Sequence, residues 1–157
     1  MGAVESNAMK FEHAAVVDGR PDVVFAITQD YAHRLRWDPF LREARLVDGA
    51  LEPAVGVRAW CVARSRFGME TEYVAYKPPR IAAVKMTRGP WFLESFGGAW
   101  EFESVEPDRT RVMFRYQLRV RPRWLAGLLE PIARRWFSRE TRLRVVALAK
   151  ALKRSDT

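Results

Sequence analysis

The most regular pattern in the chain is an alternation of apolar and polar residues over 109–121. A period of two is typical of a β-strand with one face in a hydrophobic core and the other in water. Shorter apolar runs, separated by turn-forming residues, indicate further strands. The pattern therefore predicts strands at 10–17, 41–48, 56–65, 67–77, 80–88, 95–105 and 109–121.

The last two of these strands are predicted to form an antiparallel hairpin, because the sequence Glu-Pro-Asp-Arg at 106–109 is suited to a turn. We expect Phe102 to lie opposite Phe114, which would place Glu101 opposite Arg115 on the outer surface. Opposite charges across a strand pair stabilise a sheet by roughly 0.2–1 kcal/mol. Several arginines are thereby explained as the solvated face of a strand.

Two short helices are expected between the first and second strands. Pro21 is suited to the first turn of a helix, because the N–H group that it lacks would have no partner there. Asp22 in the same turn complements the positive end of the helix dipole. A second helical turn over about 30–35 ends before Pro39, since proline disfavours helix at the residue before it.

A long C-terminal helix is predicted from Pro131 to about Arg154, after an apolar turn or short helix at 124–129. It has an apolar stripe at helical spacing, formed by Ile132, Ala133, Trp136, Phe137, Leu143, Ala147 and Ala151. This is the only predicted element long enough to cover one face of the sheet. We therefore expect an α+β fold in which a curved antiparallel sheet of about seven strands wraps around the long C-terminal helix.

Composition excludes several classes of protein. The 157 residues are 48% hydrophobic and 29% charged, which is typical of a globular domain and not of a disordered tail. The single cysteine, Cys61, excludes an internal disulfide and favours a reducing, cytoplasmic setting. Two histidines without an acidic cluster indicate neither a metal site nor a cofactor. No apolar run approaches the roughly twenty residues that a membrane span needs.

We expect a single domain over residues 9–157. Residues 1–8 are expected to be a flexible N-terminus or a cloning remnant, because Ser-Asn-Ala at 6–8 directly precedes a second methionine. The natural start of the chain is then either Met1 or Met9.

Positive charge is concentrated near the C-terminus. Residues 109–157 contain 14 Lys or Arg and 3 Asp or Glu, whereas residues 1–108 contain 13 and 16. Nucleic-acid binding would need these cations on one surface, but the strand and helix patterns place them on different surfaces. We therefore expect no nucleic-acid partner. Transient contact of the basic helix with a membrane surface is an alternative, because a carrier must meet a membrane to exchange an apolar load.

Four short motifs resemble those of the START-like (SRPBCC) superfamily, in its polyketide cyclase/dehydrase and lipid-transport branch. They are RPDVVF at 20–25, RWDPF at 36–40, KPPR at 77–80 and DRTRV at 108–112. Their order and spacing are characteristic of the fold and are not catalytic signatures. The resemblance implies a helix-grip fold with a deep cavity between sheet and helix, which holds a lipid, sterol, polyketide or other apolar molecule.

The resemblance also implies that inward aromatic and methionine side chains line this cavity instead of filling a solid core. Such side chains offer a large apolar contact area and a few polar groups. The candidate ligand-binding residues are Met69, Tyr73, Met86, Trp100, Phe102, Phe114, Tyr116, Trp136, Glu140 and Arg144.

Glu140 is unusual in this set, because it interrupts the apolar stripe of the long helix. A carboxylate that faces a core needs a partner, and Arg144 is one helical turn away. We expect this pair to supply the polar end of the cavity, unless the helix is rotated so that both residues lie at its solvated flank. Asp38 is expected to accept hydrogen bonds from nearby backbone N–H groups. The apolar segment 89–93 is expected to be an exposed loop, either a lid or a dimer contact.

These expectations favour a protein that binds or carries an apolar or aromatic small molecule, as a monomer or a homodimer. The alternative is a polyketide cyclase, aromatase or dehydratase, in which Tyr73, Tyr116, Glu140 or Arg144 would transfer protons. No catalytic signature of the enzymatic members is matched residue by residue. A membrane-associated lipid carrier and a co-regulator that acts through protein contacts are further alternatives.

Overall fold

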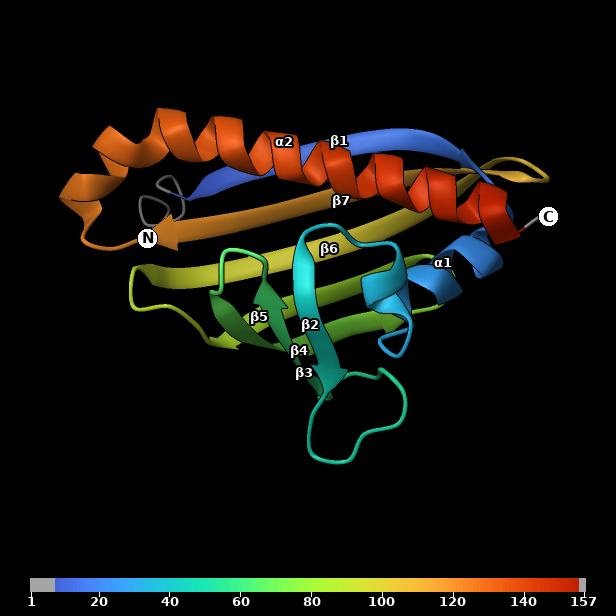
Figure 1. Cartoon of the computed structure of the whole chain (residues 1–157), viewed down its shortest axis with the longest axis horizontal. Coiled ribbons are helices and arrows are strands. Elements are labelled where there is room, and N and C mark those ends of the chain that lie inside the picture. Colours follow the sequence, from blue (N-terminus) through green and yellow to red (C-terminus); the bar gives the residue numbers. More distant parts are fainter. Residues whose placement is uncertain (1–7, 156–157) are drawn as a thin grey trace.

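A curved antiparallel sheet wraps around one long helix in the computed structural model of the chain, which describes residues 8–155 (Figure 1). The elements are β1 (Met9–Asp18), α1 (Pro21–Gln29), η2 (Arg34–Arg36), β2 (Leu41–Leu46), β3 (Arg58–Ala63), β4 (Gly68–Lys77), β5 (Ile81–Arg88), β6 (Leu93–Glu106), β7 (Arg109–Val120) and α2 (Arg123–Ser155). The predicted α+β helix-grip fold is confirmed. The segment expected to be flexible or a cloning remnant, 1–8, lies outside the described residues except for Ala8.

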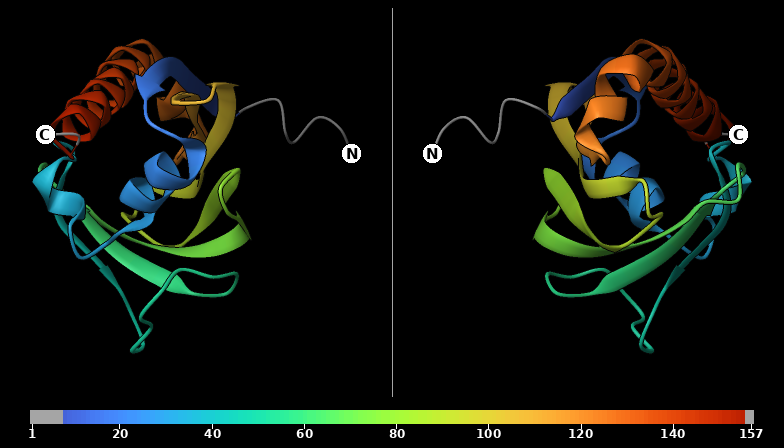
Figure 2. Two further views of the ribbon diagram at one scale, coloured as in Figure 1. Left: turned by 90° about the vertical axis from the view of Figure 1, so that its right-hand side faces the viewer. Right: turned by 90° about the vertical axis from the view of Figure 1, so that its left-hand side faces the viewer.

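The seven strands form one sheet in the order β1-β7-β6-β5-β4-β3-β2. Each neighbouring pair is antiparallel, and the first strand pairs with the last. Seen end-on, the sheet curls beneath α2, and α1 lies at one end of the concave side (Figure 2). The helix packs against β1 and β7, so the strands from β6 to β2 curve away from it.

The β6–β7 hairpin forms as predicted, but its register is shifted by two residues. Phe102 lies opposite Val112 instead of Phe114, because the turn pairs Glu106 with Arg109, one residue tighter than predicted, and one further residue is displaced between Ser104 and Glu106. A shift of two leaves every side chain on its predicted face. Arg115 still forms an ion pair with Glu101, now diagonally across the two strands.

The last helix is longer than predicted. Residues 124–129, expected as a separate turn or short helix, are part of α2, and Pro131 lies inside that helix. A proline inside a helix removes one backbone hydrogen bond and kinks the helix without having to end it. Figure 1 shows α2 bending in this N-terminal part.

The buried face of α2 differs from the predicted apolar stripe. Val145, Leu148 and Leu152 are almost completely buried, and their spacing of three and four residues defines one face of the helix. Leu143, a member of the predicted stripe, is 38% exposed, and Ile132 is 68% exposed. The helix is therefore rotated relative to the prediction, and part of its apolar surface is not covered by the sheet.

The short helix α1 begins at Pro21 as predicted and buries Val24 and Phe25. The ring of Phe25 lies 5.3 Å from that of Phe102 and 5.4 Å from that of Tyr76. The helix therefore fills one end of the concave face with a solid core. None of the helices within residues 8–155 has the length and apolar character needed to cross a bilayer.

Candidate functional site

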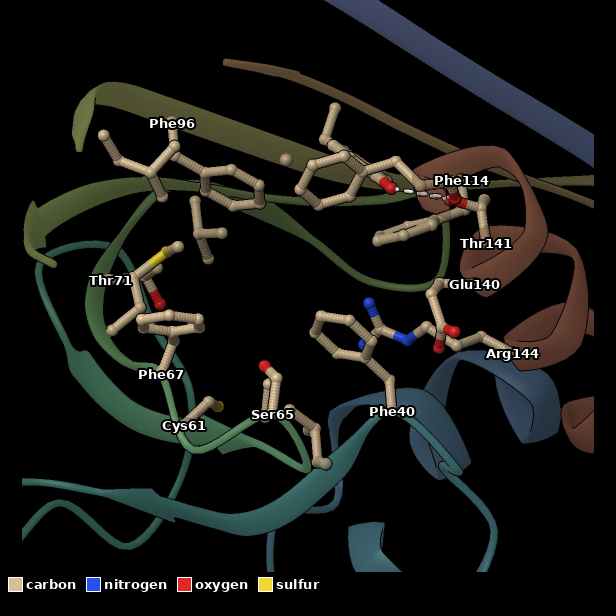
Figure 3. A pocket seen from close by; sticks show the side chains of 18 of the residues that line it. Phe40, Cys61, Ser65, Phe67, Thr71, Phe96, Phe114, Glu140, Thr141 and Arg144 are labelled. Atoms are coloured by element: carbon tan, nitrogen blue, oxygen red, sulfur yellow. Dashed lines mark hydrogen bonds between the residues drawn. The ribbon is translucent and has the colours of Figure 1, made fainter. Parts of the chain in front are cut away.

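A cavity of about 570 Å³ lies between the concave face of the sheet and α2. This volume is within the roughly 300–1,000 Å³ of typical small-molecule pockets. Most of the wall is apolar, and Figure 3 shows aromatic rings around an open space into which polar side chains of α2 project. The labelled residues in that view are Phe40, Cys61, Ser65, Phe67, Thr71, Phe96, Phe114, Glu140, Thr141 and Arg144.

The cavity is hollow because small residues occupy several inward positions of the sheet. Ala63, Ala82 and Gly98 all line it, and none of them can reach across to α2. Larger inward side chains are concentrated near the contact of α2 with β7, where the rings of Trp100 and Phe114 are 4.3 Å apart. The distribution of side-chain volume therefore leaves space over β3–β6 and fills it at β7.

Eight of the ten predicted residues line the cavity, although their role in binding a ligand stays a prediction. They are Met69, Tyr73, Trp100, Phe114, Tyr116, Trp136, Glu140 and Arg144. Alternation along the strands correctly predicted that the five of these residues that lie in strands face the concave side of the sheet.

Met86 and Phe102 are not on the cavity wall, which corrects the prediction for both. The ring of Phe102 packs against α1, as described above. The sulfur of Met86 lies where a side chain at Gly89 would begin, so Met86 folds against the loop after β5. Both residues face the concave side, but neighbouring segments cover them.

A buried ion cluster lies beside the cavity. Asp38 Oδ2 accepts hydrogen bonds from Arg34 Nε (2.9 Å) and from Arg144 Nε and Nη2 (3.2 and 2.8 Å). Its Oδ1 accepts one from the backbone N–H of Phe40 (3.0 Å), as expected for a turn aspartate. The carboxylate thus joins η2, the start of β2 and α2.

This cluster corrects the prediction of a Glu140–Arg144 pair. Arg144 binds Asp38, and within residues 8–155 the side chain of Glu140 forms no hydrogen bond or ion pair. Helical spacing allowed the predicted pair, but the bend between η2 and β2 brings a second carboxylate, Asp38, within reach of the same guanidinium. Glu140 is half-buried and projects into the cavity beside Arg144 (Figure 3).

Asp38 is unsuited to act as a general base. Burial alone would raise the pKa of its carboxyl group, but the charges of Arg144 and Arg34 and their hydrogen bonds outweigh burial and hold this pKa below its ordinary value of 3.8. A carboxylate with a lowered pKa and occupied lone pairs has little tendency to accept a proton. Asp38 therefore serves to hold the two arginines.

Two tyrosine networks contribute the other polar groups of the wall. Tyr73 donates to Gln29 Oε1 (2.6 Å) and is 3.0 Å from the hydroxyl of Tyr31. Because Tyr73 has one proton, Tyr31 must donate to Tyr73. On α2, the Thr141 hydroxyl donates to Tyr116 (2.9 Å), which itself donates to the backbone carbonyl of Phe137 (3.1 Å). Figure 3 marks the contact of Thr141 by a dashed line.

The free energy of unfolding should fall as the pH rises from about 10 to about 12. Burial is the main cause that raises the pKa of Tyr31 and of Tyr116 from 10.0 to about 12. Above pH 10 the unfolded chain loses phenol protons that the folded chain retains, so the stability present below pH 10 is lost as the pH approaches 12. Urea denaturation across this range measures the loss, and a Tyr31→Phe/Tyr116→Phe variant should show a weaker dependence on pH.

Several wall residues were not predicted as ligand-binding residues, among them Gln29, Tyr31, Arg34, Phe40 and Thr141. The spacing of Arg34 and Asp38, four residues apart in a helical turn, was a usable signal for their pairing. The positions of Tyr31 and Phe40 depend on the path of the chain between α1 and β2, and those of Gln29 and Thr141 on how α1 and α2 pack.

The other potentially reactive or metal-binding side chains are one cysteine and two histidines. Cys61 is half-buried and lines the cavity, and burial raises the pKa of its thiol. His33 binds Asp30 at the surface, and His13 lies in β1 opposite Phe114. Among residues 8–155 there is no group of three or more His, Cys, Asp or Glu side chains that could hold a metal ion.

Several exposed apolar side chains belong to the cavity wall or lie next to wall residues in the sequence. We define the exposed apolar rim as Phe67, Trp91, Leu128, Ile132 and Trp136, of which Phe67, Ile132 and Trp136 also line the cavity. The segment 89–93, predicted as an exposed loop, is exposed only in part: Trp91 is 72% accessible to solvent, whereas Leu93 begins β6 and is buried at 6%. Between them, Phe92 turns inward and packs on Phe67, with 5.0 Å between the ring centroids. Exposed apolar side chains therefore lie beside the cavity on the sheet side and on α2.

The fold and this cavity define a protein of the helix-grip class with an apolar interior chamber. The model of the family described as polyketide cyclase/dehydrase and lipid transport matches residues 8–153. The chain belongs to this family, which confirms the resemblance seen in its motifs.

Solved structures support the same fold at low sequence identity. The Zhui aromatase/cyclase from a Streptomyces species is 15% identical, with a TM-score of 0.77 over 96% of this chain and 96% of that chain. The di-domain aromatase/cyclase StfQ of the steffimycin pathway is 14% identical, with a TM-score of 0.77 over 98% of this chain and 54% of that chain. Norcoclaurine synthase from Thalictrum flavum, in complex with dopamine and hydroxybenzaldehyde, is 11% identical, with a TM-score of 0.70 over 94% and 87%. No curated protein matches the chain.

Proposed function

We propose that the protein binds an apolar or aromatic small molecule, lipid-like or polyketide-like, and acts as a binder or carrier. The observation that carries this proposal is the apolar cavity of about 570 Å³ between the sheet and α2. Burial of apolar surface favours binding by about 25 cal/mol for each Å² removed from water. The cavity therefore suits a molecule whose binding depends mainly on shape and desolvation.

Most polar groups of the cavity wall already have hydrogen-bond partners within the protein, which supports binding more than catalysis. The hydroxyls of Tyr73 and Tyr116 already donate to Gln29 and to a backbone carbonyl, and Asp38 is occupied by two arginines. Within the described residues no nucleophile is paired with a base. A cytoplasmic location, expected from the single cysteine, belongs to the same proposal.

A matched pair of glycine variants tests the proposal. Gly97 and Gly98 are neighbours in β6, and a side chain at Gly98 would project among Phe96 and Tyr116 on the cavity side, whereas one at Gly97 would approach Gln117 on the outer face. Gly98→Leu should therefore weaken binding of the apolar fluorophore N-phenylnaphthylamine by at least about tenfold, through loss of space. Gly97→Leu should leave the affinity unchanged.

Native mass spectrometry of the purified protein complements this experiment, with an apolar co-purified molecule as the expected result. Failure of the wild-type protein to bind any apolar probe, or equal affinities of the two glycine variants, would remove the proposal. Thermal unfolding of both variants verifies that the comparison is made between folded proteins.

A second candidate function is a cyclase or aromatase that acts on a polyketide-like substrate. Its support is the family itself and the likeness in fold to the Zhui and StfQ proteins. Here the cavity would hold a reactive chain in a folded conformation, and the half-buried Glu140 is the carboxylate available as a base. Turnover of a poly-β-ketone that depends on Glu140 would favour the enzyme over the binder.

A third candidate is a lipid carrier that contacts membranes. The exposed apolar rim supports it, because Trp and Leu side chains of this kind insert into the interfacial region of a bilayer, and α2 carries basic residues along its exposed side. Co-sedimentation with anionic vesicles that is lost on replacement of Trp91 and Ile132 by serine would favour this candidate.

A further inference from the structure

Two cations share one anion at the wall of the cavity. The side chains of Arg34, Asp38 and Arg144 are 7%, 0% and 11% exposed. Arg34 and Arg144 line the cavity, whereas Asp38 lies behind them. Two guanidinium groups and one carboxylate leave this cluster with an excess positive charge. An excess charge in an apolar environment is costly unless it finds a partner.

Each arginine also has a donor nitrogen that the protein does not use. Arg34 donates through Nε to Asp38 and through Nη1 to the carbonyl of Thr28, and Arg144 donates through Nε and Nη2. Within residues 8–155, Nη2 of Arg34 and Nη1 of Arg144 have no hydrogen-bond partner. The only enclosed side-chain nitrogen or oxygen without a partner in this range belongs to Trp37. The two arginine nitrogens therefore face open space.

Glu140 is not paired with this cluster. It is the other charged residue of the wall, but in the described part of the chain it forms no ion pair with either arginine. Its side chain is half-buried, so it is in part accessible to solvent. The side chains of Arg34 and Arg144, 7% and 11% exposed, are therefore more deeply buried than the half-buried Glu140.

Aromatic rings surround the arginines and define where the rest of a ligand would lie. The guanidinium carbon of Arg144 is 4.8 Å from the ring of Phe114 and 5.1 Å from that of Phe40. Figure 3 shows the Arg144 side chain reaching between these two rings, with the open space beside it. A group bound to the free nitrogens would be continuous with the apolar part of the cavity.

We infer that the ligand carries an organic oxyanion, a carboxylate or an ionised enol or phenol, which accepts hydrogen bonds from Arg34 and Arg144. This inference rests on the proposed binding function and specifies its ligand. The apolar body of the molecule would lie against the rings of Phe96 and Phe114, with its acidic end at the arginines. Hydrogen bonds between charged groups are shorter and stronger than neutral ones and add specificity to a mainly apolar site.

Two fluorophores that differ by one acidic group test the inference. Anilinonaphthalene sulfonate and N-phenylnaphthylamine share their rings, and only the first is an anion. We expect the wild-type protein to bind the anion at least about tenfold more tightly, as charge-assisted hydrogen bonds allow. Arg144→Gln should abolish this preference while N-phenylnaphthylamine still binds, because Asp38 and Arg34 remain as a neutral pair. Glu140→Gln, which removes the other wall charge, should keep or increase the preference.

Displacement of the neutral fluorophore then distinguishes the kinds of acid. Naphthoic acid represents the carboxylate, a nitronaphthol represents the ionised phenol, and naphthamide is the neutral control. Preferential displacement by either acid, lost in Arg144→Gln, supports the inference. Equal displacement by naphthamide, or a preference unchanged in Arg144→Gln, would overturn it and leave the binding function intact. A preference that disappears in high salt overturns it as well, since exposed charges are screened far more than buried ones.

Wild-type affinities for the two fluorophores need no variant, so the inference is testable even if Arg144→Gln unfolds. If N-phenylnaphthylamine does not bind at all, the proposed binding function fails, and not only its acidic specificity. The two failures are therefore distinguishable in one titration series.

Discussion

Replacement of Asp38 by asparagine should lower the free energy of unfolding by about 3–5 kcal/mol. Asparagine has nearly the same shape, but it removes the one negative charge that Arg34 and Arg144 share. Both guanidinium groups would then be buried without a counter-charge. Loss of one partner from a buried ion cluster costs far more than the cluster contributed, because the remaining charges keep their desolvation penalty.

Urea denaturation at neutral pH measures this loss. If the slope of the unfolding free energy against urea concentration is the same in both proteins, the unfolding transition is unchanged and the two free energies can be compared. Asp48→Asn is the matched control, since Asp48 binds Arg58 at the surface and is 65% exposed. Exposed pairs contribute at most about 1 kcal/mol. A loss at Asp38 no larger than that at Asp48 would show that the cluster is not the buried unit described above.

Acid should diminish the difference between the wild-type protein and Asp38→Asn. The pKa of Asp38 lies below its ordinary value of 3.8 in the folded state, so the unfolded chain takes up this proton first. The stability that depends on the ionised carboxylate is present above pH 3.8 and is lost as the pH falls below it.

Leu148→Ala should reduce the free energy of unfolding by about 2–5 kcal/mol. Leu148 is completely buried at the centre of the face by which α2 contacts the core. Truncation removes three carbon atoms from a close-packed environment and leaves a cavity that the long helix and the twisted sheet can fill only in part.

Leu128→Ala on the same helix is the control, because Leu128 is 69% exposed and should change stability by less than about 0.5 kcal/mol. Calorimetry or urea denaturation of the two variants compares them directly. Since Leu148 does not line the cavity, the folded Leu148→Ala protein should bind N-phenylnaphthylamine with nearly wild-type affinity. Similar stabilities of the two leucine variants would mean that α2 is not anchored through this face.

The two substitutions address separate attachments of α2. Leu148 holds the helix to the core by burial, whereas Arg144, one turn earlier, ties it to Asp38 by charge. Together they fix the helix at a distance from β3–β6, and the cavity is the space that this distance leaves.

Much of the architecture was predictable from sequence. Strict alternation over 109–121 identified β7 and its inward residues Phe114 and Tyr116, because a pleated strand turns successive side chains to opposite faces. Turn-forming residues separated the other strands, and four motifs indicated the family. The wall positions of Met69, Tyr73 and Trp100 follow from the same alternation and the curvature that the family implies.

The predictions failed where the packing of a neighbouring element decides which side chains are covered. Phe102 has the same parity as Trp100, yet α1 covers it. The apolar stripe of α2 was placed by spacing alone, and spacing cannot tell whether Val145 or Leu143 meets the sheet. Periodicity gives the direction of a side chain relative to its own element, but it contains no information on what lies opposite.

Sequence alone therefore determined the elements, their order and the apolar character of the concave face. Tertiary structure alone decided that Arg144 binds Asp38, 106 residues away along the chain, and not Glu140 one turn before it. It also decided that small side chains at Ala82 and Gly98 leave an open chamber. The reason is physical: local spacing acts through the backbone of one element, whereas ion pairs and cavities depend on the distance between elements, which the packing of the whole chain sets.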